Sequence, residues 1–239
     1  MRFMECSAYL KQQEMAYVRE AQRIESLPLA PRGFWRALLW KLRGERGRAL
    51  AARSSRVAGL LREAHYYRQG RAGEDALHWN LARQLDNRFI LLRSYTPPYP
   101  WHMGGDIDAV LVGPHGVTVF EAKAWNGQYH CAGDGWWYWS PFRAAWEPAQ
   151  GNPTAQAQAN AERVAKTLLD RGMPDVRVQP MVAITSPKMR VALDRQRPPK
   201  VYLYFAHSPR ATFGRRDSRP TLAQAQVEAI WQALVRPTA

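Results

Sequence analysis

The sequence predicts an α/β fold in which a central mixed β-sheet is flanked by helices and preceded by a mostly helical N-terminal extension. Residues 1–68 are rich in Ala, Leu, Arg and Glu, with helix-forming segments such as 14–24 and 50–67. Strand-like runs at residues 107–112 and 117–123 flank the turn-forming residues 113–116. Helical and strand patterns then alternate toward the C-terminus, as is typical of an α/β domain.

Length and composition limit the organisation of the chain. Its 239 residues, 46% of them hydrophobic, fit one sizeable domain plus an appendage. We expect an extension over residues 1–68 and a domain over 69–239, whose motifs concentrate in 70–170. Cys6 and Cys131 lie far apart without metal-ligand spacing, which favours a reducing compartment. With no signal peptide and only short apolar runs, the expected location is the cytoplasm, without a transmembrane segment.

The charge of the chain is strongly basic and unevenly distributed. The formal net charge is +14, and residues 1–72 carry 15 Lys and Arg against 6 Glu, a net charge of +9. This excess indicates a polyanionic partner, most simply nucleic acid. Contact of the basic N-terminal helices with a membrane surface is the alternative. It would use the stripe of Trp35, Leu38, Leu39 and Leu42, which equally suits a helix docked on the core.

The remaining elements follow in order from local patterns. A break is expected at residues 27–33, and a helix over 74–85 places Leu77, Leu81 and Leu85 on one stripe. Glu74 then falls in the first helical turn, where it either complements the helix dipole or serves a site. Strands are expected at residues 89–94, 128–132, 135–140, 176–184 and 200–205. Two further helices are expected, one capped by Asn152 and running to about residue 171, and a last one over residues 222–235. The run of Trp and Tyr at 136–139 suits packing or the stacking of bases.

The hairpin at residues 107–123 carries the strongest functional signal. A two- or four-residue loop pairs Val112 with Val117 and puts Asp108 opposite Glu121, with Lys123 on the face of Glu121. Opposed like charges repel, so a divalent metal and the lysine would compensate two carboxylates held there. A Glu and a Lys two residues apart are commonly a solvated strand edge. Here both faces of the strands are apolar, which indicates a central position in the sheet.

Four blocks in order over about 90 residues make the chain similar to a known family. These are Gly70-Arg71-Ala72-Gly73-Glu74, Ile107-Asp108 before a hydrophobic strand, residues 116–127 with Glu121, Lys123, Trp125 and Gly127, and Asn152-Pro153-Thr154-Ala155-Gln156. The pattern resembles the nuclease-related domain, NERD, of the PD-(D/E)XK nuclease superfamily. The residue after the family's Asp is often His, and Ala109 stands there in this sequence.

The resemblance implies a fold, a reaction and a set of site residues. It implies a PD-(D/E)XK-like sheet with Asp108 and Glu121 as ligands of Mg²⁺ or Mn²⁺, which prefer oxygen donors. Lys123, Glu74 and Gln156 are the expected catalytic residues, and Asn160 and Trp125 the expected supporting ones.

The expected protein is a Mg²⁺-dependent nuclease that hydrolyses phosphodiester bonds, most simply in DNA. The alternative is a non-catalytic nucleic-acid-binding module on the same fold. No arrangement of His or Cys supports acyl transfer, and residues 70–73 lack the Lys-Ser/Thr ending of a phosphate-binding loop.

Overall fold

The computed structural model describes residues 2–5, 9–27, 45–98, 100–208 and 221–236. The expected helical stripe around Trp35 and most of the expected break at 27–33 lie outside these ranges. The chain divides into two compact units, residues 9–71 and residues 72–239 with the first eight. The boundary between them falls between Arg71 and Ala72, and the sequence-based boundary at residue 69 stays a prediction.

The unit of residues 9–71 is helical, as predicted. Helix α1 (Tyr9–Ser26) packs against the first part of α3 (Glu45–Gln84) through a small apolar cluster formed by Ala21, Ile24 and Val57. Buried Glu14 accepts from the guanidinium of Arg68 at 2.9 Å. No helix in the described part of the chain is both long and apolar enough to cross a membrane.

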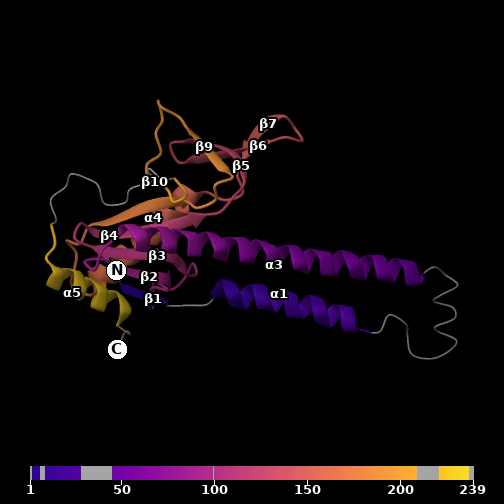
Figure 1. The fold of residues 1–239 in the computed structure, drawn as a ribbon, viewed down its shortest axis with the longest axis horizontal. Helices are drawn as coiled ribbons and strands as arrows, with labels where there is room; N and C mark the ends of the chain where they lie inside the picture. The colour runs from indigo at the N-terminus through magenta and orange to yellow at the C-terminus, as the bar shows by residue number, and fades with distance from the viewer. Residues whose placement is uncertain (1, 6–8, 28–44, 99, 209–220, 237–239) are drawn as a thin grey trace. The chain divides into compact units, whose positions relative to one another are not determined.

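The second unit is built on a mixed six-stranded sheet, which confirms the predicted fold class (Figure 1). Its strands, in spatial order, are β1 (Arg2–Glu5), β2 (Ile90–Tyr95), β3 (Ile107–Gly113), β4 (Gly116–Lys123), β8 (Val178–Ile184) and β10 (Tyr202–Phe205). Strands β2, β3 and β4 run antiparallel to their neighbours in this group, whereas β1 joins β2 and β8 joins β4 in parallel. The expected pairing of Val112 with Val117 is confirmed.

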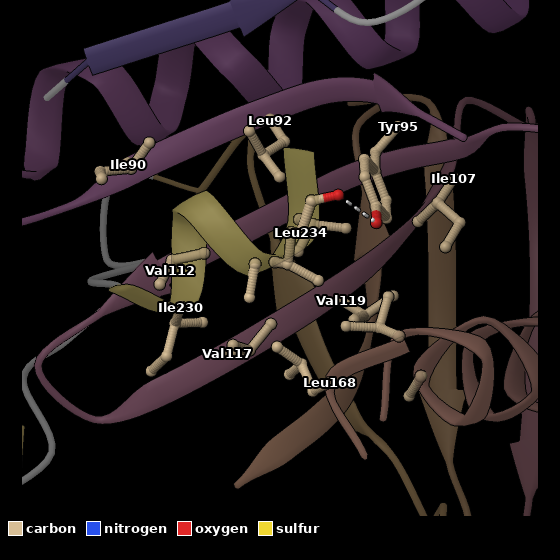
Figure 2. Packing of buried hydrophobic residues seen from close by; sticks show 14 of the residues in the cluster. Ile90, Leu92, Tyr95, Ile107, Val112, Val117, Val119, Leu168, Ile230 and Leu234 are labelled. Atoms are coloured by element: carbon tan, nitrogen blue, oxygen red, sulfur yellow. Dashed lines mark hydrogen bonds between the residues drawn. The ribbon is translucent and has the colours of Figure 1, made fainter. Parts of the chain in front are cut away.

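Side-chain alternation along the central strands divides the core into two layers. Val110, Val112, Val117 and Val119 face α4 (Pro153–Asp170) and α5 (Gln224–Val235), where they pack with residues such as Leu168 and Leu234. Figure 2 shows this layer, in which the Tyr95 hydroxyl donates to the Leu234 carbonyl at 3.0 Å. On the other face, Leu111 and Phe120 pack with Leu77, Leu81 and Leu85 of α3. Burial on both faces explains why these strands lack a polar alternation.

A second, four-stranded sheet begins with β5, the next strand along the chain after β4 of the first sheet. Its order is β7 (Ala145–Pro148), β6 (Gly135–Ser140), β5 (Gly127–Ala132) and β9 (Met189–Leu193). The hairpin of β5 and β6 is confirmed, whereas β7 and β9 were not predicted. Both are short edge strands, of four and five residues, and their pairing depends on partners that sequence periodicity does not identify.

Two sequence expectations about the N-terminal half are wrong. Residues 2–5 were expected in the helical extension, but they form β1 and pair with Ile90–Arg93. The segments 50–67 and 74–85 were expected as separate helices, but one helix, α3, runs through both for 40 residues. Gly70 and Gly73 therefore lie in a helix interior, where glycine is tolerated at a cost of about 1 kcal/mol. Consequently Glu74 is not in a first turn, and the helix dipole does not explain it.

Gly73 is required because α3 passes very close to the ends of two strands. A Cβ built on Gly73 would lie 2.6 Å from the Cβ of Ala124 and 2.8 Å from Oγ1 of Thr185. Contacts this short do not occur between real Cβ atoms, so either the helix or the strand end would have to move.

Gly73→Ala is therefore expected to destabilise the protein by about 1–3 kcal/mol, the usual cost of overpacking. Gly59→Ala, in the same helix with nothing within 4 Å of the added Cβ, is the matched control and should be neutral or stabilising. Denaturant unfolding of the two variants measures both effects. Equal stability of the two would contradict the close approach.

Candidate active site

The hairpin of β3 and β4 positions the first carboxylate. The ladder between β3 and β4 pairs Ala109 with Phe120, and continuing this register by one residue sets Asp108 opposite Glu121. Ladder pairing ends here, and the Asp108 side chain instead accepts a hydrogen bond from the backbone N–H of Ala122 at 2.6 Å. The Asp108 carboxylate is thereby fixed between the two strand ends.

Glu121 is the most enclosed carboxylate of the group, with a residue exposure of 8%. Its Oε1 accepts from Nζ of Lys123 at 2.7 Å, and its Oε2 accepts from Nδ2 of Asn160 on α4 at 3.0 Å. Each oxygen of this buried charge therefore has its own donor. The structure thus brings Glu121, Lys123 and Asn160 together. The ammonium of Lys123 also lies 5.5 Å from the ring centre of Trp125, which places Trp125 beside the cluster.

Glu74 approaches this cluster from α3. Its pKa is raised to about 7, first by burial and then by the charges of Asp75 and Glu121, while a hydrogen bond from Ser94 acts in the opposite direction. The pKa of Asp108 also lies well above its ordinary value. Burial is the largest cause, and the negative charges of Glu121 and Glu74 add to the shift. The three carboxylates therefore lie within each other's electrostatic field, and the protein's own donors compensate them only in part.

The donor chemistry of this cluster fits a hard divalent cation. Carboxylate oxygens are the ligands that Mg²⁺ prefers, and a cation would offset the burial and the mutual repulsion that raise the pKa values of Glu74 and Asp108. Among the residues described, no three His, Cys, Asp or Glu side chains come together as a ready-made metal site. The ligands expected from the sequence, Asp108 and Glu121, would leave the other coordination positions to water and substrate oxygens, as is usual for Mg²⁺.

Gln156 occupies a different position from the other expected residues. It lies on α4 one turn before Asn160, and its residue is exposed. No hydrogen bond within the described chain joins its side chain to the carboxylates. The helix turns Asn160 toward Glu121 and leaves Gln156 on the outer, solvent-facing part of the same stripe.

Three residues beside the carboxylates were not among the expected site residues. Arg163 donates to Oδ1 of Asn160 at 3.0 Å and also to the carbonyls of Trp101, His102 and Gly105 at 2.9, 3.3 and 2.7 Å. Its position three residues after Asn160 on a polar helical stripe was the available signal. His78 is buried, and its Nε2–H donates to the Asp108 carbonyl at 3.2 Å.

The pKa of His78 is lowered to about 4, first by burial and then by the positive charge of Arg93. The His78 ring is therefore neutral near pH 7. Ser94, the third residue, has a φ of +46° inside β2, a conformation that costs a non-glycine residue about 1–3 kcal/mol. Neither His78 nor Ser94 has a local sequence signal.

Comparison with known protein families identifies the same part of the chain as the carboxylate cluster. The family model described as the nuclease-related domain matches residues 69–185, a range that contains Glu74, Asp108, Glu121, Lys123, Trp125, Gln156 and Asn160. Neither the curated proteins nor the solved structures gave a match to the chain. Residues 69–185 of this α/β protein therefore belong to the nuclease-related domain (NERD) family, which is placed in the PD-(D/E)XK superfamily.

Proposed function

We propose that this protein is a divalent-metal-dependent nuclease, and that Asp108, Glu121 and Lys123 form its reactive centre. The observation that carries the proposal is the pair of carboxylates on adjacent strand ends with a lysine bonded to one of them at 2.7 Å. Family membership supports a nuclease-related role, and the net charge of +14 supports a polyanionic substrate. DNA is the proposed substrate. The cytoplasm remains the proposed location, supported by a free, buried Cys131.

Each protein group has a defined task in this proposal. A bound Mg²⁺ or Mn²⁺, held by Asp108 and Glu121, would supply Lewis-acid polarisation of the phosphoryl oxygen and a more acidic water. Lys123, fixed by Glu121, positions the attacking water and offsets the negative charge that develops on the phosphate. Asn160 holds the second oxygen of Glu121 in place. Glu74, with its pKa near neutrality, can exchange a proton with a water at the site.

Gln156 is proposed as a substrate contact at the rim rather than as part of the carboxylate cluster. Its exposed amide offers both a donor and an acceptor. From that position, it can reach a phosphate or water that arrives from solvent. Trp125 is proposed to limit the mobility of Lys123 through its ring, which lies under the ammonium.

The raised pKa of Glu74, caused first by burial and then by neighbouring carboxylates, predicts the pH dependence of stability. Between the ordinary pKa of Glu74, 4.5, and its folded value of about 7, the native state binds more protons than the unfolded chain, so stability falls as pH rises through this window. The melting temperature in EDTA should accordingly decrease from about pH 5 to pH 8, and Glu74→Gln should flatten this decrease.

The matched control is Glu162→Gln, which removes an exposed carboxylate of α4. This control should keep the wild-type slope. A wild-type slope in Glu74→Gln as well would show that Glu74 does not titrate in this window.

Metal binding should reverse part of that destabilisation. Because a cation bound only to the native state stabilises it, Mg²⁺ or Mn²⁺ should raise the melting temperature at about pH 8. Asp108→Asn removes one negative ligand and should reduce the shift, whereas Asp175→Asn, an exposed carboxylate after α4, should leave it unchanged. Calorimetry with and without EDTA makes the comparison. An undiminished shift in Asp108→Asn would place the metal elsewhere.

The decisive experiment separates an enzyme from a binding module. Purified protein is incubated with circular DNA, linear DNA and RNA in the presence of Mg²⁺, Mn²⁺ or EDTA, beside Lys123→Ala and the control Lys11→Ala, an exposed lysine of α1. Lys123→Ala should lower turnover by about 10²-fold, the scale for loss of one preorganised electrostatic group, and keep binding within a few-fold. Tight binding by the wild type without cleavage under any metal condition would establish the binding module instead.

A further inference from the structure

The second sheet has two faces with different surroundings. On one face, Trp136 is 4% exposed and its Nε1–H donates to Oγ1 of Thr154 at 2.9 Å, so this face packs against the start of α4. Trp125 and Tyr129 are partly buried and pack against the cluster that contains Trp136. Because side chains alternate along β6, Trp137 and Trp139 lie on the opposite face.

That opposite face carries four aromatic rings in continuous contact. The register pairs His130 with Trp137 and Trp139 with Trp146. The ring centres of His130 are 5.8 Å from Trp137 and 5.9 Å from Trp146, and those of Trp139 and Trp146 are 5.6 Å apart. The strands are labelled β5, β6 and β7 in Figure 1. We call His130, Trp137, Trp139 and Trp146 the aromatic face.

The aromatic face is open to solvent in the described structure. Trp146 is 46% exposed, and the other three rings are partly exposed. Phe142, in the turn between β6 and β7, is 97% exposed. Rings of this size normally pack inward, and a contiguous set left outside indicates a binding surface. The flat rings suit a ligand that has flat π-faces of its own.

The charges around this sheet favour an anionic ligand. Each acidic side chain of the sheet and its connections already has a cationic partner: Asp134 pairs with Lys200 at 2.5 Å, Glu147 with Arg143 at 3.0 Å and Asp194 with Arg197 at 3.3 Å. Arg190 pairs in register with Gln128, so it shares the face of His130, and it is exposed. Arg190 has no acidic partner in the described residues, so its guanidinium is available to an external anion.

We propose that the aromatic face binds the unpaired bases of single-stranded nucleic acid, with Arg190 contacting its phosphates, an inference that takes its ligand class from the proposed function. Bases stack on such rings without sequence preference, whereas in a duplex their faces are already stacked on each other. Strand β5 begins at Gly127, shortly after Lys123. The sheet that carries the aromatic face is thus joined through three residues to the strand that ends beside the carboxylates, and the proposed substrate class is single-stranded nucleic acid or a single-stranded end.

The test measures binding in EDTA, so that it does not depend on cleavage. Fluorescence anisotropy follows labelled single-stranded oligonucleotides of about 15 nucleotides, a length within the usual site size, beside the matching duplex. Trp139→Ala/Trp146→Ala should weaken single-strand binding by at least about tenfold, since stacking contributes about that much per base. Trp146→Phe, which keeps a flat ring, should retain most of the affinity. Arg190→Gln should lower the salt dependence of binding by about one phosphate contact.

Two controls distinguish a specific loss of base stacking from a general effect of removing tryptophan or of damaging the fold. Trp79→Ala removes a tryptophan of α3 that is 68% exposed, and it should bind like the wild type. The double variant should keep the metal-induced rise in melting temperature, which shows that the domain and its carboxylates are intact. Unchanged binding by the double variant, equal affinity for duplex, or displacement by an uncharged oligosaccharide would each overturn the inference. A wild type that binds single strands through these rings yet never cleaves them would overturn the proposed function alone.

Discussion

Two carboxylates that face each other across a hairpin are the constraint on which the rest of the site depends. Asp108 and Glu121 lie on adjacent strands of a sheet covered on both faces, where interactions between charges are much stronger than in water. One oxygen of Asp108 accepts a hydrogen bond from the backbone N–H of Ala122. The two oxygens of Glu121 accept from the ammonium of Lys123 and the amide of Asn160. The raised pKa values of Glu74 and Asp108 show that these donors are insufficient. Protonation or a bound cation would complete the compensation, so the electrostatics of the fold and the proposed chemistry have the same origin.

The position of Asn160 depends in turn on a second set of interactions. Arg163 holds Oδ1 of Asn160, and its remaining donors bind three carbonyls of the loop between β2 and β3. The same loop is attached to α4 through Trp101, whose Nε1–H donates to Asp170 at 2.6 Å and whose ring lies 5.0 Å from the ammonium of Lys166. One guanidinium therefore couples the loop conformation to the orientation of Glu121. A bidentate, rigid donor suits this role, and lysine could not reproduce it.

The parts of the structure that the sequence predicted are those with strong local patterns. The hairpin register followed from the turn between residues 113 and 116, and α4 followed from Asn152, whose side chain accepts from Ala155 N at 3.1 Å. The central strands were recognisable because they are apolar on both faces. By contrast, β1, β7 and β9 contain four or five residues each, too few for a periodic signal. The expected helix start at residue 74 lay directly after the Gly70–Glu74 block of the family resemblance, and α3 instead continues through both glycines. His78 and Ser94 reach the site only through the pairing of distant elements, which no local pattern encodes.

The site is assembled where helices from both faces of the sheet meet the same strand ends. Asn160 comes from α4 on one face, and Glu74 and His78 come from α3, which packs on the other. For α3 to reach this edge, its backbone must pass Ala124 and Thr185 at a distance that excludes any side chain at Gly73. The glycine directly before Glu74 is therefore the steric condition for bringing a third carboxylate to the pair on β3 and β4. That requirement accounts for a Gly-Glu pair in a helix interior, where neither the glycine nor a buried acid would otherwise be favourable.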